Sequence, residues 1–156
     1  MRLLPLQWLD TGKHATEALY SVTTGLAALG KDYERSDVAI VGIASNDASA
    51  YPEDAPEELA RVAHQLGYSF PVLYDEDQEA ARAFTAACTP DFFLFDSDRS
   101  LVYRGQFGGA RPNNGVDVTG ESLRAAIDAL LSDQAVPTDQ LPSLGCSIKW
   151  KSDGER

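Results

Sequence analysis

Apolar residues recur at three- and four-residue steps in three segments, 19–33, 59–66 and 123–131, which predicts amphipathic helices there. The middle helix is expected over 55–66, with Pro56 at its first position and Asp54 as its cap. Thr119, or a residue near it, is expected to cap the last helix. A fourth, short helix is predicted over 78–84, where preceding acidic residues suit the positive end of the helix dipole.

Uninterrupted apolar runs predict the strands. The run 38–45 is rich in Val and Ile, which is typical of a strand buried on both faces of a parallel sheet. Residues 70–74 predict a second strand, and 92–96 with 101–105 predict a hairpin around a four-residue loop. This order of elements predicts an α/β fold, with a mixed central sheet flanked by helices, in one domain over 1–156. Residues 1–15 are atypical within it, and 133–156 form an irregular tail.

Composition narrows the range of partners. The 156 residues are 44% hydrophobic and 24% charged, as in globular proteins, and the formal net charge is −11. A surface this negative repels nucleic acids and anionic membranes, so neither is expected as a partner. No apolar run is long enough to span a bilayer, and Pro5 and Asp10 interrupt the N-terminal apolar stretch before it forms a signal-peptide core. We therefore expect a cytoplasmic protein.

The chain has two cysteines, Cys88 and Cys146, too few for the disulfide scaffold of a small secreted protein. Either they are buried and inert or they carry redox chemistry. His64 has no second ligand at zinc spacing, and the acidic run 75–79 lacks the spacing of a calcium loop. No metal site is predicted.

Several ordered blocks resemble peroxiredoxin-like proteins of the AhpC/TSA-related redoxin family, which have the thioredoxin fold. The blocks are Gly25–Leu29, Ser45–Asp47, Tyr51–Asp54, Phe70–Asp75, Ala87–Asp96, Leu101–Gly105 and Ser143–Trp150. The resemblance implies a cis-proline at Pro90, after Thr89, facing the active site. It also implies a thiol–disulfide oxidoreductase or antioxidant protein that acts on protein thiols, disulfides or a peroxide without a cofactor.

The chain departs from this family at its N-terminus. The family has a Cys-Asn-His-Cys-Pro run at the start of the first helix, and this chain has residues 13–17, Lys-His-Ala-Thr-Glu, at that place. A helix start favours the thiolate of a cysteine, a role that Lys13 and Thr16 cannot fill. The preceding central strand would be Leu3–Leu9, but Pro5 cannot donate to a strand ladder. We therefore expect the first strand to be atypical or missing.

Cys88 precedes Thr89-Pro90, so the resemblance puts it near the cleft, and the tail that carries Cys146 could fold back over it. One interpretation is a relocated redox pair, and the other is a buried structural Cys88. Arg104 and Arg111 could add positive charge that contacts an anion near the cleft.

Three hypotheses about function remain open. The chain is an impaired thiol oxidoreductase of the peroxidase or disulfide reductase type, dependent on Cys88 and Cys146. Alternatively, it is a redox-inactive module that binds an extended peptide at the strand edge beside Thr89-Pro90. A third hypothesis is a family member with a truncated N-terminus, whose open sheet would favour a homodimer.

Overall fold

The computed structural model describes residues 2–7, 17–111 and 114–152, with side chains from Val22 onward. Five strands form one sheet of order β3-β2-β1-β4-β5. The strands are β1 (Arg2–Gln7), β2 (Val38–Ala44), β3 (Val72–Tyr74), β4 (Asp91–Phe95) and β5 (Leu101–Gly105). The helices are α1 (Glu17–Tyr33), a short 3-10 helix (Pro52–Asp54), α2 (Pro56–Leu66), α3 (Glu79–Ala83) and α4 (Glu121–Leu131). The sheet is mixed, because β1 pairs in parallel with β2 and antiparallel with β4.

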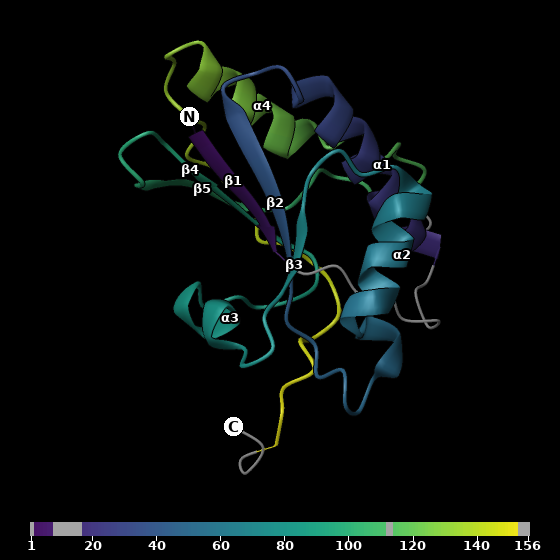
Figure 1. Ribbon diagram of the computed structural model, residues 1–156. Helices are drawn as coiled ribbons and strands as arrows, with labels where there is room; N and C mark the ends of the chain where they lie inside the picture. The colour runs from purple at the N-terminus through teal and green to yellow at the C-terminus, as the bar shows by residue number, and fades with distance from the viewer. Residues whose placement is uncertain (1, 8–16, 112–113, 153–156) are drawn as a thin grey trace.

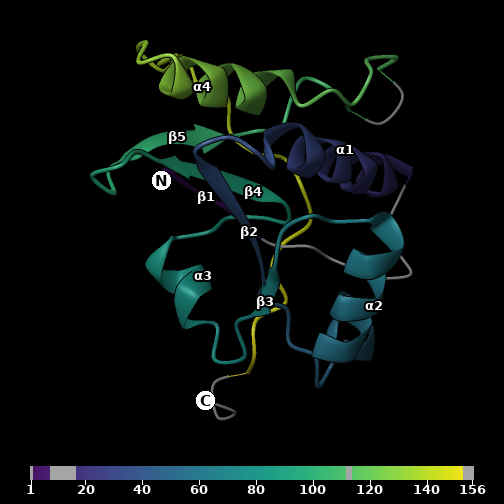
Figure 2. The same cartoon turned by 45° about the horizontal axis from the view of Figure 1, so that its top comes forward.

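The helices lie on both faces of the sheet. Figures 1 and 2 show α1 and α4 together on one face, α3 on the other, and α2 beside the β3 edge. Side chains alternate along β4, so this strand contributes to both faces. Phe92 and Leu94 belong to the main core with α1 and α4, whereas Phe93 packs in a smaller cluster with Ala81 and Ile148. The order of elements and the two-faced sheet confirm the predicted α/β fold.

The prediction that Pro5 would keep the first strand out of the sheet centre is wrong. β1 lies between β2 and β4, and Pro5 is in register with Val41 of β2. The pairing of β1 with β4 joins Leu3 to Phe95 and Leu6 to Phe92 but skips Leu4 and Pro5. A proline lacks the N–H that a ladder needs, and the ladder is interrupted where the proline lies. With β1 in place, an open sheet centre no longer gives a reason to expect a homodimer.

One predicted helix cap, Asp54, is also wrong. The residue before α2 is Ala55, without a side-chain cap, while Asp54 is buried and accepts a hydrogen bond from Asn46 Nδ2 at 2.9 Å. The cap of α4 is Gly120, at φ +73°, which is adjacent to Thr119 and confirms the expected cap at Thr119 or near it. Glycine adopts this left-handed conformation without steric cost, so it can end the preceding loop without a capping side chain.

The predicted irregular tail has no helix or strand within residues 132–152, but its contacts are extensive. It first follows the open edge of β5. There the Gln140 side chain accepts a hydrogen bond from the Arg104 backbone N–H and donates one to the Val102 carbonyl, both at 2.9 Å. The tail then crosses from the side of α4 to the side of α3 (Figure 2). We call its last part, residues 143–151, the C-terminal strap.

Candidate functional site

The site is formed where the strap crosses the loop before β4. The Thr89–Pro90 peptide bond is cis, as expected. Cys146 pairs antiparallel with Thr89 through two backbone hydrogen bonds, Thr89 N–H to Cys146 O at 2.8 Å and Cys146 N–H to Thr89 O at 3.1 Å. An extended peptide would need this same edge of Thr89. In this structure the chain's own strap occupies it.

Gly145 allows the strap to come this close. A Cβ atom at Gly145 would lie 1.9 Å from the Thr89 carbonyl oxygen. Because the obstacle is backbone rather than a movable side chain, no other residue fits without displacing the strap. The glycine before Cys146 is therefore a requirement of the Thr89 pairing.

The two thiols differ in environment. Cys88 is buried, with Sγ 3.5 Å from the Pro90 carbonyl oxygen, and Cys146 is exposed. The pKa of Cys88 is raised to about 11, mainly by burial and next by the Asp91 carboxylate, while the charge of Arg104 acts in the opposite direction. The Cys146 sulfur is near enough to raise this pKa as well. Cys88 is therefore a protonated thiol beside an accessible one.

The register separates the two thiols by one residue. Cys146 is opposite Thr89, so the continuation of the antiparallel pairing would put Ser147 opposite Cys88. Successive side chains of an extended segment point to opposite sides. The structure thus brings Cys88 and Cys146 to one crossing point but does not face them directly.

A group of buried polar side chains holds the far end of the strap. Gln78, 1% exposed, donates from Nε2 to the Ser45 carbonyl at 2.7 Å and to the Lys149 carbonyl at 2.9 Å. Its Oε1 accepts from the Lys151 N–H at 2.9 Å, and Asn46 Oδ1 accepts from the Lys149 N–H at 3.0 Å. We call Gln78 and Asn46 the amide clamp.

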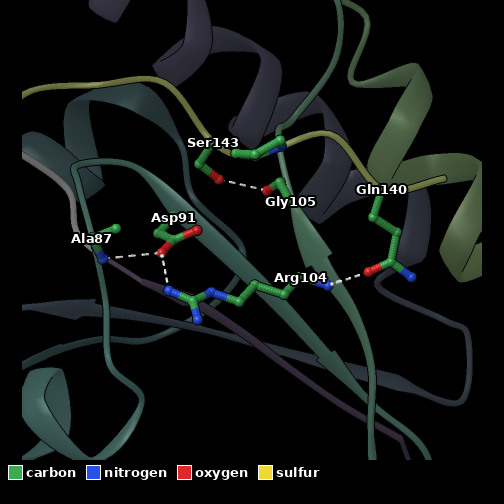
Figure 3. Close-up of a pocket in the computed structure, with 7 residues that line it drawn as sticks. Ala87, Asp91, Arg104, Gly105, Gln140 and Ser143 are labelled. Atoms are coloured by element: carbon green, nitrogen blue, oxygen red, sulfur yellow. Dashed lines mark hydrogen bonds and ion pairs between the residues drawn. The ribbon is translucent and has the colours of Figure 1, made fainter. Parts of the chain in front are cut away.

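A small cavity of about 220 Å³ lies beside the crossing point, lined by Asp91, Arg104, Gln140 and Ser143 among others (Figure 3). Asp91 Oδ2 accepts from the Ala87 N–H at 3.2 Å and lies 3.4 Å from Arg104 Nη2. The same Nη2 donates to the Thr85 carbonyl at 2.7 Å. The Arg104 side chain is thus already engaged at this wall.

Arg111, the second arginine expected to contact an anion, lies apart from this cavity. Arg111 donates to the Gly108 and Ala110 carbonyls and to Gln106 Oε1 in the loop before α4. Arg104 lines the cavity described above, and Arg111 is not among its lining residues. Lys13, His14 and Thr16 lie outside the described residues.

Within residues 2–7, 17–111 and 114–152, no group of three or more His, Cys, Asp or Glu side chains could hold a metal ion. No helix in these ranges is long and apolar enough to cross a membrane.

Sequence reasoning missed the amide clamp and the edge contact of Gln140. The clamp binds backbone groups of an irregular segment up to 103 positions away, and Gln140 binds backbone groups of β5 from within that segment. Such contacts have no periodic signal. Asp91 lies in one of the sequence blocks that carry the family resemblance, but nothing in the sequence indicates that its charge acts on Cys88. The polar run Ser45–Asp47, directly after the apolar run of a buried strand, is the signal that could have pointed to the clamp.

Comparisons with known proteins agree with this geometry. The sequence model of the AhpC/TSA family matches residues 13–104. A crystal structure of an uncharacterized conserved protein from Geobacillus kaustophilus is 50% identical, with a TM-score of 0.91 over 98% of this chain and 79% of that one. A hypothetical protein from Sinorhizobium meliloti is 46% identical, with a TM-score of 0.91 over 97% and 80% of the chains.

A more distant structure shows the fold alone. A secreted disulfide oxidoreductase of Mycobacterium tuberculosis, homologous to E. coli DsbE, is 14% identical, with a TM-score of 0.57 over 83% of this chain and 81% of that one. No curated protein matches the sequence. The family match covers more than half of the chain, and the cis-proline loop, the sheet order and the structural neighbours are those of a thioredoxin-like fold. The chain therefore belongs to the AhpC/TSA family, a thiol-redox family with the thioredoxin-like fold.

Proposed function

We propose that the protein is a thiol oxidoreductase that reduces a hydroperoxide with Cys146 and Cys88. The observation that carries the proposal is the backbone pairing of Thr89 with Cys146, which holds an exposed thiol beside a buried one at cis-Pro90. The sequence has two cysteines, so this pair must carry any dithiol chemistry of the chain.

The two thiols take different roles in the reaction. The Cys146 thiolate attacks the terminal peroxide oxygen, the O–O bond breaks, and the leaving oxygen takes a proton as water or an alcohol. Cys146 is then a sulfenic acid. The Cys88 sulfur, after losing its proton, attacks the Cys146 sulfur, a disulfide forms and water leaves. Overall, two thiols are oxidised and one hydroperoxide is reduced.

The environments of the thiols support this order. Cys146 is open to a small oxidant, whereas Cys88 is buried and its pKa is raised to about 11 by burial. A buried, protonated thiol reacts slowly with external oxidants but can attack a neighbouring sulfenic acid. Cys146 is therefore the peroxide-reacting thiol, and Cys88 resolves it.

The decisive experiment is the intact mass of the native protein after thiol alkylation, with and without prior hydrogen peroxide. We expect peroxide to abolish alkylation of both cysteines and to lower the mass by two hydrogen atoms. The Cys88→Ser variant should instead stop at a Cys146 sulfenic acid, trapped by a dione reagent. The Cys146→Ser variant should show no early peroxide-dependent change.

Other outcomes reject the proposal. If both thiols are alkylated equally before and after peroxide, the protein is redox-inactive and its family chemistry has been lost. If both are alkylated only after denaturation under either condition, the cysteines are structural.

A further inference from the structure

The amide clamp and the Thr89 pairing act on the same short segment, so they fix its register together. Cys146 pairs with Thr89, and only three residues later Lys149 is bound on both its N–H and its carbonyl. The Asp47 N–H adds a second hydrogen bond to the Lys149 carbonyl, at 2.9 Å. Ile148, 4% exposed, fills the apolar cluster with Ala81, Ala86 and Phe93 between these two anchors. These contacts leave the strap little freedom to slide along Thr89.

The proposed disulfide requires a different register. Because Cys146 lies opposite Thr89, the strap must shift by one residue, about 3.3 Å, to put Cys146 opposite Cys88. A one-residue shift also turns each side chain to the other side. Ile148 would leave its apolar cluster, and Lys149 would leave the amide groups that bind it. The contacts at residues 148–151 therefore oppose the closure of the disulfide.

We propose that Gln78 is a positioning residue for the thiol pair, holding the strap in the register that keeps Cys146 apart from Cys88. Gln78 reaches the strap through the backbone of Lys149 and Lys151, and neither of these hydrogen bonds involves a thiol. The inference rests on the proposed peroxide reaction of the same two cysteines. It makes disulfide closure, rather than the first oxidation of Cys146, the step that the clamp controls.

The test measures the two steps separately for Gln78→Ala. In the variant with both cysteines, we expect hydrogen peroxide to form the disulfide about tenfold faster, the effect of losing one or two neutral hydrogen bonds. In a Cys88→Ser background, Cys146 sulfenic acid should form at the unchanged rate, because that thiol is already exposed. Gln65→Ala, on the outer surface of α2, is the matched control and should change neither rate.

A second variant tests the same inference without a substitution at Gln78, so that a folding defect of Gln78→Ala does not decide the result. Ile148→Ala weakens the same docking from the strap side and leaves the clamp intact. It should also accelerate disulfide closure without changing sulfenic acid formation. Hydrogen exchange supplies an independent readout, since the backbone N–H groups of Lys149 and Lys151 should be protected in the reduced protein and exchange faster in the oxidised one.

The outcomes separate this inference from the proposed function. If the disulfide forms in the wild type but no faster in either variant, or if the Lys149 and Lys151 amides stay protected after oxidation, Gln78 does not set the register. If the wild type forms no disulfide at all, the peroxide reaction fails first. If Gln78→Ala accelerates both steps equally, the variant has loosened the whole site and the positioning role is rejected.

Discussion

Asp91 is the charged residue with the largest effect on the pKa of the buried Cys88 thiol. Its side chain is 3% exposed, between the Ala87 N–H and the Arg104 guanidinium. After burial, its negative charge is the next cause of the raised pKa of Cys88. A neutral side chain of the same shape would remove that charge and keep the hydrogen bond from Ala87.

Asp91→Asn should therefore lower the pKa of Cys88 and speed its alkylation severalfold at mildly alkaline pH. The measurement is the pH dependence of the alkylation rate in a Cys146→Ser background, where Cys88 is the one remaining thiol. Asp98→Asn, on the exposed hairpin loop, is the matched control. An unchanged or raised pKa would show that the Asp91 charge is screened from the thiol.

At the scale of single elements, the tail covers the edge of β5 with the side chains of Gln140 and Ser143. The Gln140 amide satisfies the Arg104 N–H and the Val102 carbonyl as a neighbouring strand would. Unpaired groups on a strand edge can pair with another chain. The tail therefore protects this edge from a second copy of the protein.

Gln140→Ala should consequently increase self-association, visible as a concentration-dependent rise in molar mass by light scattering. Gln134→Ala serves as the control, because the exposed Gln134 side chain donates to the Ser132 carbonyl just before it in the chain, away from β5. If neither variant self-associates more than the wild type, water satisfies the exposed edge groups adequately.

The elements with periodic patterns could be predicted, and those without them could not. The helix over 19–33 and the strand over 38–45 were predicted from spacing and composition, and both are present. Pro5 misled the prediction of β1, since the proline rule describes one residue whereas pairing is decided over the whole strand. The sequence indicated that the tail with Cys146 could fold back over the cleft, and it does, but the register of the strap could not be predicted, because an isolated backbone pair such as Thr89 with Cys146 places no demand on side-chain periodicity.

At the scale of the whole molecule, a buried thiol and buried tyrosine hydroxyls stay protonated in the folded protein. We therefore expect the free energy of unfolding to fall in alkali. Burial raises the pKa of Cys88 from 9.0 to about 11 and those of Tyr33 and Tyr103 to about 12, and it also raises the pKa of Tyr68. Above pH 9 the unfolded chain loses the Cys88 proton while the folded chain keeps it. Unfolding then releases a proton, so stability falls as the pH rises.

The free energy of unfolding should thus decline between pH 9 and 11, with Cys88 contributing on the order of 2 kcal/mol. Tyrosine ionisation in the unfolded chain should extend the decline above pH 10. Urea denaturation at pH 8.5, 9.5 and 10.5 measures it, for the wild type and for Cys88→Ala. The variant should lose less stability over this range. Equal slopes for the two proteins would mean that the Cys88 thiol ionises alike in the folded and unfolded chains.

The alternation of side chains along β4 has a consequence for the order in which parts of the molecule unfold. Phe92 and Leu94 anchor the large core under α1 and α4, and Phe93 anchors the small cluster that includes Ile148 of the strap. The two sets of contacts share a strand but no side chain. The strap and the small cluster can therefore open while the large core stays closed. A protease should find its first cleavage sites in the tail, and the rest of the domain should survive that first cut.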